Sequence, residues 1–423
     1  MRNQKRKLKP RWEVILPTLV GLVLIIFLLV NFFGWLFSLF LSSSDPRNSV
    51  YCSRKSINTV NNLVNKTIEK TDVIGDYFFY GESLVLTSER HDRLGKENTY
   101  SGKNIKLVDI CSNKSYNFKL GDKFDDFIPI KKLGTGIYEV YLIEGDNEIR
   151  LSAGYSFQTE IYTVVSNQKS MLVTVFADKN YFNKISEESL LKENYLFIKV
   201  NQEALPSDVY DIIIDPQYNE KDDDTLSNDV KAGSEEAIKL FDMANKLAAN
   251  LRTQGFKVAI TRDTLDEEML TYGIDGRINR VIDSSAKYYI GLTLNESPYE
   301  DKRGVRIIHS AYSSDTLAES IYNQLSAQGV NFDSKAVLSL PLIHNYDSLI
   351  DIREMGGIAL QAATYSSYAQ MENESFAVTV KGVNGISISL GYISNEEDKE
   401  EFANKYESWV QHLSIAISDY LKK

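Results

Sequence analysis

The sequence predicts three parts: an N-terminal transmembrane helix, an all-β sandwich-like middle domain, and a C-terminal α/β domain with a mostly parallel sheet covered by helices. Three observations predict them: one long uncharged segment near the N-terminus, closely spaced short β-type runs, and alternating strand and helix patterns in the second half. The expected boundaries are a basic tail (1–12), a transmembrane helix (13–42), a stalk (43–71), the β-rich domain (72–177), a linker (178–208) and the α/β domain (209–423).

Length and composition are those of a folded protein of two or three domains, with 423 residues, 43% hydrophobic and 25% charged. Six basic residues and no acid precede residue 13, so the rest of the chain carries 41 basic and 58 acidic side chains, a net charge of −17. Phosphate backbones are bound by clustered Lys and Arg. An ectodomain this acidic argues against nucleic-acid binding.

The uncharged segment runs from Val14 to Leu41, which is 28 residues. About 20 helical residues span a bilayer core, and the cations before the segment predict a cytoplasmic N-terminus with everything after it outside. A cleaved signal peptide is the competing interpretation. The segment is longer than the roughly 7–15 apolar residues of a signal peptide, and no A-x-A site follows it. These features favour an uncleaved single-pass anchor in the cell membrane.

Cys52 and Cys111 are the two cysteines, and both are expected in an extracytoplasmic compartment where a disulfide can persist. One disulfide and two free thiols are both compatible with the sequence. The β-rich stretch after Asp72 contains aromatic and branched runs such as Tyr77–Tyr80, and Gly145-Asp146-Asn147 has the composition of a hairpin turn. It has no cluster of His, Asp or Glu with ligand spacing, which favours a spacer or protein-binding role.

The α/β pattern begins with the short apolar strand Asp211–Pro216, typical of a buried parallel strand. A helix with apolar residues at helical spacing follows and stops at Gly255. Further strands are expected at Lys257–Thr261, Lys287–Leu294, Val305–His309 and Gly385–Leu390, with helices near Gly276–Ser285 and over Thr316–Gln328. A last helix buries Trp409. Repeated units of this kind predict a mostly parallel sheet covered by helices.

A series of short motifs follows this pattern. They are Asp215-Pro216 after the first strand, Glu236 with Phe241 and Ala244, Thr261-Arg262, Arg277, Ala286-Lys287, Gly291–Asn295 and Ser389–Asn395. In this order and spacing they resemble the zinc-dependent N-acetylmuramoyl-L-alanine amidases (the amidase type 3 family) of the bacterial cell wall, over about residues 209–423. One insertion, within 338–376, interrupts the resemblance.

In that family two histidines and a glutamate hold zinc, and a second glutamate acts as general base or acid. The resemblance puts the histidine positions at Tyr218 and Thr293 and the catalytic glutamate at Ser389, so only Glu236 is retained. One carboxylate does not hold zinc, which needs three protein ligands for hydrolysis. We therefore expect no metal and no catalytic residue. The expected substrate groove comprises Tyr218, Glu236, Arg277, Thr293, Asn295 and Ser389, with Arg277 alternatively a structural ion-pair residue.

The resemblance implies a catalytically inactive amidase-like protein of peptidoglycan metabolism, a pseudoenzyme that binds peptidoglycan, a cell-wall enzyme or an assembly protein. The alternative is an active amidase that cleaves the amide between N-acetylmuramic acid and L-alanine through a relocated metal site. Such a site would combine His309, on a predicted strand, or His344, in the insertion, with Glu236.

Overall fold

The computed structural model describes residues 70–88, 98–164, 170–182, 191–217, 234–267, 277–310, 313–340 and 380–423. The chain divides into two compact units, residues 1–62 and 63–423, and every described residue lies in the second. The expected anchor at 13–42, Cys52, Tyr218, His344 and residues 341–376 of the insertion lie outside the described residues. The helices of the described ranges include none with the length and apolar character needed to cross a bilayer.

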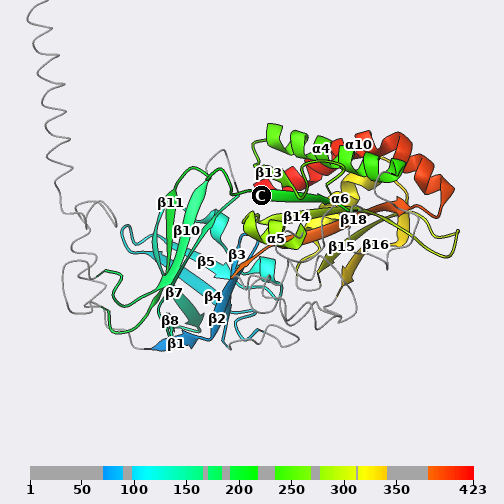
Figure 1. The fold of residues 1–423 in the computed structure, drawn as a ribbon. Coiled ribbons are helices and arrows are strands. Elements are labelled where there is room, and N and C mark those ends of the chain that lie inside the picture. The colour runs from blue at the N-terminus through cyan, green and yellow to red at the C-terminus, as the bar shows by residue number, and fades with distance from the viewer. Residues whose placement is uncertain are drawn as a thin grey trace, which may run out of the picture. The chain divides into compact units, whose positions relative to one another are not determined.

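An eight-stranded sheet forms the larger part of the β-rich region (Figure 1). Its strands are β1 (Thr71–Ile74), β4 (Asn104–Asp109), β5 (Ser115–Lys119), β7 (Gly136–Glu144), β8 (Asn147–Ala153), β9 (Phe157–Tyr162), β10 (Met171–Ala177) and β11 (Leu196–Gln202). The order is β1-β8-β7-β11-β10-β9. In addition, β4 pairs with β7, and β5 pairs with β4. Only β1 with β8 is parallel among these pairs. The expected hairpin turn lies between β7 and β8, where Gly145 takes a φ of 60°.

A second sheet of four strands has the order β17-β2-β3-β6. Its strands are β2 (Asp76–Tyr80), β3 (Ser83–Thr87), β6 (Ile128–Pro129) and β17 (Lys381–Gly382), and the 3-10 turns η2 (Phe124–Asp126) and η3 (Ile130–Lys132) flank β6. Buried side chains of β2 and β3 share one hydrophobic core with those of β4, β7, β8, β10 and β11. Two sheets around one core make a sandwich.

The structure corrects the expected linker at 178–208, because part of this range forms a strand of the sandwich. β11 lies within 178–208 and pairs with both β10 and β7, so the β-rich region extends to Gln202. Its sequence is nearly all apolar at its start, LFIKV, and shows no strict alternation of apolar and polar residues. A central strand is buried on both faces, which removes that alternation.

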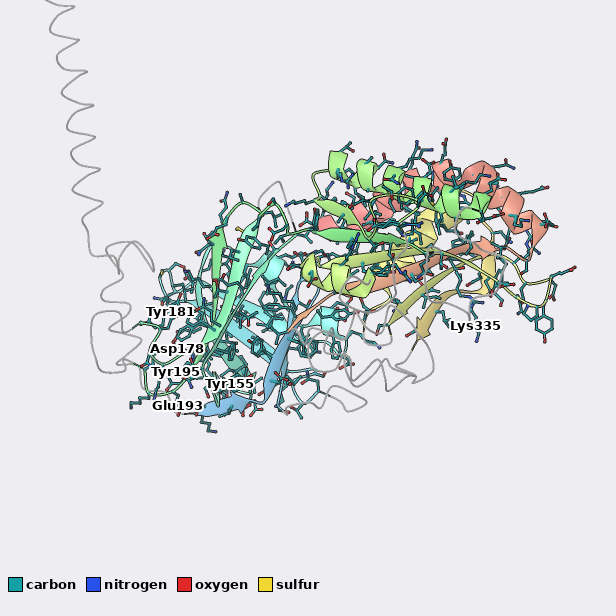
Figure 2. The ribbon with its side chains drawn as sticks, in the orientation of Figure 1. Tyr155, Asp178, Tyr181, Glu193, Tyr195 and Lys335 are labelled. Atoms are coloured by element: carbon teal, nitrogen blue, oxygen red, sulfur yellow. The ribbon has the colours of Figure 1, made fainter. Side chains whose placement is uncertain are left out.

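Aromatic side chains gather at one end of β9, β10 and β11. Figure 2 shows Tyr155, Tyr181 and Tyr195 near Asp178 and Glu193 at this end. Arg150 of β8 is 1% exposed, and its guanidinium lies 4.7–5.4 Å from the ring centroids of Tyr141, Tyr195 and Phe197. Its Nη1 is 2.5 Å from a carboxylate oxygen of Glu139. The sandwich therefore contains a buried ion pair surrounded by aromatic rings.

The α/β region contains a six-stranded sheet of order β13-β12-β14-β18-β15-β16. Its strands are β12 (Ile212–Pro216), β13 (Val258–Ile260), β14 (Tyr288–Asn295), β15 (Val305–Ser310), β16 (Phe332–Leu340) and β18 (Asn384–Tyr392). All neighbours are parallel except β15 with β18, so the expected mostly parallel sheet is confirmed. The sequence analysis missed β16, whose end reaches into the expected insertion at 338–340.

Four described helices accompany this sheet: α4 (Glu235–Thr253), α5 (Arg277–Asp283), α6 (Thr316–Ser326) and α10 (Glu396–Lys422). Apolar side chains of α4, α6 and α10 share one core with one face of the sheet, including Ile214, Ile290 and Ile388. Val281 of α5 packs with Ile213 and Tyr289 of the other face. Figure 1 shows α4 and α10 together on one side of the sheet and α5 on the other.

The turn between β2 and β3 joins the sandwich to the α/β sheet. Gly81 takes a φ of +56°, and a Cβ there would lie 3.1 Å from Cβ of Asn384 and 3.2 Å from the carbonyl oxygen of Lys287. Glu82 follows and is 4% exposed, accepts a hydrogen bond from the Val164 N–H, and has one carboxylate oxygen 3.7 Å from Lys131 Nζ. A carboxylate is therefore buried at this junction.

The carboxyl of Glu82 predicts a pH-dependent stability. Burial raises its pKa to about 6, against the attraction of Lys131 and Lys287, while Asp211 raises it further. The folded chain holds this proton more tightly than the unfolded chain, so the contribution to stability is full below the ordinary pKa of 4.5 and is lost as pH rises through 6. We expect the full-length chain to lose about 2 kcal/mol of unfolding free energy relative to Glu82→Gln between pH 4.5 and 7.

Urea unfolding of both proteins at each pH measures this difference. Asp283 is exposed, so Asp283→Asn serves as the matched control and should show no such pH-dependent difference. A Glu82→Gln difference that stays constant between the two pH values would contradict the prediction.

Candidate functional site

The candidate site lies at the carboxyl ends of β12, β14 and β18, on the sheet face opposite α4, α6 and α10. Residues paired across a sheet share a face, and alternate residues along a strand do so too. One row across the sheet is Asp215, Gly291 and Ser387, and the next is Thr293, Ser389 and Arg306. The strands alternate with the helix-covered Ile214, Leu292 and Ile388. Polar side chains therefore line one face where three parallel strands end.

Asp215 fixes the end of β12. It is fully buried, and its Oδ2 accepts hydrogen bonds from Arg277 Nη1 at 2.8 Å and from the Tyr289 hydroxyl at 2.6 Å. Its Oδ1 accepts a third from the Thr261 hydroxyl at 2.6 Å. Arg277 is itself 3% exposed. This contact favours the structural alternative for Arg277 over a groove residue, and the network holds the strand end from which residue 218 follows.

Thr293 and Ser389 are brought together, as direct register partners on β14 and β18. Ser389 is fully buried, and its Oγ has no hydrogen-bond partner in the described ranges. Thr293 is half-buried and its hydroxyl donates to the Leu294 carbonyl at 3.2 Å. The two positions that the resemblance marked as ligand and base thus form one pair of neighbouring hydroxyls.

Asn295 ends β14 beside this pair. Its backbone carbonyl accepts a hydrogen bond from the Ile393 N–H at 2.8 Å, while its buried Nδ2 has no partner within the described part of the chain. The register shifts between Thr293 and Asn295, because β18 advances from Ser389 to Tyr392 over the same interval. Gly391 lies in this bulge with a φ of 126°. A Cβ at Gly391 would lie 3.1 Å from Cβ of Asp398, so a side chain is disfavoured there.

Glu236 lies in the first turn of α4 and is half-buried. The helix is capped by Ser234, whose hydroxyl accepts from the Ala237 N–H at 3.1 Å. Arg252 in the last turn of α4 donates to the Val258 carbonyl at the start of β13, so the helix begins toward the carboxyl edge of the sheet. Tyr218, the remaining predicted groove residue, lies outside the described residues.

An ion-pair cluster beside Ser389 was missed by the sequence analysis. Arg306 is the β15 register partner of Ser389, and its Nη2 donates to Asp333 Oδ2 and to the Tyr392 hydroxyl, both at 2.7 Å. Burial alone would raise the pKa of Asp333, but hydrogen bonds from the Lys335 N–H and from these neighbours hold it well below its usual range. Lys335 lies on β16 (Figure 2). The sequence contained one signal for this cluster, which is the cation Arg306 within a predicted strand.

His309 lies away from the candidate site. Its register partner is Ile386, which faces the helix-covered core, so His309 lies on the opposite face from Ser389. β15 runs antiparallel to β18, which puts His309 three residues further from the carboxyl edge than Arg306. The ring Nδ1 is 3.3 Å from the Ser313 hydroxyl, and burial lowers the pKa of the imidazole. No group of three or more His, Cys, Asp or Glu that could hold a metal occurs within the described ranges.

Cys111 is disulfide-bonded, and the other cysteine of the sequence, Cys52, lies outside the described residues.

Comparisons with known proteins identify the family. The family model for N-acetylmuramoyl-L-alanine amidase, Amidase_3, matches residues 212–423, half of the chain. No curated protein matches the chain.

Solved structures that are similar include three amidases. Ami1 from Mycobacterium smegmatis is 14% identical, with 50% of this chain and 96% of that chain covered and a TM-score of 0.35. AmiC2 of Nostoc punctiforme is 16% identical, with 51% and 99% covered and a TM-score of 0.34. The CwlD amidase from Clostridioides difficile, in complex with the GerS lipoprotein, is 16% identical, with 50% and 98% covered and a TM-score of 0.34. The assignment rests on the family model, by which the chain belongs to the N-acetylmuramoyl-L-alanine amidase family.

Proposed function

We propose that this chain is a membrane-anchored, extracytoplasmic amidase-like protein that binds peptidoglycan without hydrolysing it. The observation that carries the proposal is the pairing of Thr293 with Ser389 at the end of β14 and β18. These are the positions where the resemblance implies a histidine ligand and a catalytic glutamate. The half-buried Thr293 hydroxyl can form a hydrogen bond with a ligand, and neither position supplies an imidazole or a carboxylate.

The donor set does not fit the zinc ion that the family resemblance implies. Zinc in proteins takes Cys, His and carboxylate ligands, and a catalytic site uses three of them. The aligned positions here are Tyr218, Thr293 and Glu236, which provide one carboxylate and two hydroxyls. A hydroxyl at Ser389 also does not exchange a proton near neutral pH as a general base would. We therefore assign no hydrolytic step to this site.

Binding is supported by polar groups left available at the same edge. Ser389 Oγ and Asn295 Nδ2 are buried without hydrogen-bond partners in the described ranges. A buried donor without a partner costs free energy, which a bound acceptor would recover. Peptidoglycan presents amide carbonyls and carboxylates, which are acceptors of this kind. Asp215 and its three donors supply a fixed strand end beside the groove.

The membrane anchor and its orientation rest on the sequence alone. The uncharged segment Val14–Leu41 after a basic tail would put residues 43–423 outside the cell membrane, where the wall lies. We propose the domain boundaries expected from the sequence, except that the β-rich region extends through β11 to Gln202.

The test combines three measurements on the full-length chain in detergent. We expect co-sedimentation with purified peptidoglycan, no release of peptide stems, and less than stoichiometric zinc by elemental analysis. Thr293→Ala and Asn295→Ala should each weaken sedimentation about fivefold or more, since each removes a hydrogen-bonding group. Thr253→Ala, an exposed threonine at the far end of α4, is the matched control and should bind normally.

The opposite result would establish the active alternative. An amidase with a relocated metal site would bind stoichiometric zinc and release peptide stems, and Glu236→Ala would abolish that release. Sedimentation unaffected by both site variants would place peptidoglycan binding elsewhere and contradict the proposed groove.

A further inference from the structure

A cavity of about 450 Å³ follows β13, away from the proposed peptidoglycan groove. β13 is the edge strand of the six-stranded sheet as far as the structure describes it. The cavity is lined along the strand from Lys257 to Ile260 and continues to Arg262 and Asp263. At about 3.3 Å per residue, the part along the strand, Lys257 to Ile260, is about 10 Å long and matches about four residues of extended chain.

The backbone of β13 presents hydrogen-bonding groups to this cavity. The Lys257 carbonyl and the Thr261 N–H bond to residues of β12. Because these groups alternate in direction along a strand, those of Val258 and Ile260 point away from β12. The outward Val258 carbonyl accepts from Arg252 Nε at 3.1 Å and Nη2 at 2.8 Å. The Val258 N–H and both groups of Ile260 face the same outer side.

The cavity is positively charged although the ectodomain is strongly acidic. Arg252, Lys257 and Arg262 line it, against a single carboxylate, Asp263. The Asp263 N–H donates to Glu267 at 2.7 Å, and Glu267 forms an ion pair with Arg280. Local positive charge in a chain of net charge −11 favours a negatively charged ligand.

Arg262 adds an unpartnered group to this cavity. It is 2% exposed, and its guanidinium lies 4.9 Å from the ring centroid of Phe241. Nη1 donates to the Leu265 carbonyl at 3.2 Å, but the buried Nε and Nη2 have no partner among the described residues. Burial lowers the pKa of this guanidinium, partly offset by Asp215 and Glu267. A carboxylate supplied by a ligand would satisfy the free Nε and Nη2 donors of Arg262 through charge-assisted hydrogen bonds.

We propose that this cavity is a docking groove for an extended acidic segment of a partner protein, which pairs with the outer edge of β13 and places a carboxylate against Arg262. The outward Val258 N–H and the two backbone groups of Ile260 supply backbone pairing, and the three cations select the acidic sequence. An extended strand also puts alternate side chains on one side, so an acid at every second position would face the cations. The site is separate from the proposed peptidoglycan groove.

Fluorescence anisotropy with the full-length chain in detergent tests the proposal. The probe is a labelled hexapeptide that alternates threonine and glutamate. We expect saturable binding that Lys257→Gln and Arg262→Met each weaken about tenfold, the effect of one charge-assisted hydrogen bond. Lys405→Gln removes an exposed lysine of α10 and is the matched control, with unchanged binding expected. Lys257 is only partly buried, so its variant remains informative if Arg262→Met fails to fold.

Two further peptides separate strand pairing from simple anion binding. A hexapeptide that alternates threonine and lysine should not bind, and neither should the acidic peptide with alternate backbone nitrogens methylated. Three results would each overturn the docking groove. They are binding of either of these peptides as tight as that of the acidic probe, displacement of the probe by inorganic phosphate without any effect of methylation, and no binding of the acidic probe. Since peptidoglycan sedimentation does not enter this readout, failure here leaves the proposed function untouched.

Discussion

Asp215→Ala is expected to lower the free energy of unfolding of the α/β region by about 3–5 kcal/mol. The change removes the acceptor of three buried hydrogen bonds and leaves the Arg277 guanidinium buried without its countercharge. Losing one partner of a buried ion pair costs more than the pair itself contributes, because the remaining charge is no longer compensated. Urea unfolding of the full-length chain, followed by tryptophan fluorescence to which the buried Trp409 contributes, measures this loss.

Two comparisons separate charge from hydrogen bonding at this position. Asp215→Asn retains the size of the side chain and one of the two acceptor oxygens, so it should be less destabilising than alanine. Lys405→Ala breaks an exposed i,i+4 pair with Glu401 and should cost about 0.5 kcal/mol or less. A loss below about 1 kcal/mol for Asp215→Ala would show that the network does not stabilise the strand end.

Arg150→Ala is expected to have an effect of similar size, about 3–5 kcal/mol, in the sandwich. The arginine side chain is 1% exposed and its partner Glu139 6% exposed, so the substitution leaves a buried carboxylate without its cation. The change also removes the guanidinium that contacts the rings of Tyr141 and Phe197 and leaves a cavity. Thermal unfolding monitored by near-ultraviolet circular dichroism follows these aromatic side chains.

A double-mutant cycle distinguishes the ion pair from packing. Arg150→Met and Glu139→Met should each destabilise strongly, whereas the double variant buries no charge and should be less destabilised than the sum of the two. Additive losses would indicate that Arg150 acts by filling volume alone. Lys103→Met, which disrupts the half-exposed pair with Glu144 on the same sheet, is the matched control and should have little effect.

The α/β fold was predictable because most of its strands are apolar runs and helices separate most of them along the chain. The start of β12 and the end of α4 agree closely with the expected elements, and Gly255 follows the helix with a φ of 96°. β16 was not predicted, because FDSKAVLSL mixes polar and apolar residues without a clear period. The antiparallel direction of β15 relative to β18 was also not predictable, because the sequence of one strand does not encode whether its neighbour is parallel.

The candidate site was only partly predictable. The motif order identified Thr293 and Ser389, and the structure makes them neighbours. Whether Arg277 served the groove or the core depended on where Asp215 pointed, which is a tertiary contact across 62 residues. The free donors of Arg262 depend on burial among side chains from α4 and the β13 loop, and no local pattern reports that.

The placement of β17 has a practical consequence for dissecting the protein. Lys381 and Gly382, which belong to the family-matched half, pair with Phe79 and Tyr80 of the sandwich, and the Phe79 N–H bonds to the Val380 carbonyl. A fragment that begins near residue 209 would lose this pairing and leave an uncovered strand beside newly exposed apolar surface. Shortened versions intended for assay should therefore begin before Thr71, or low solubility could be mistaken for inactivity.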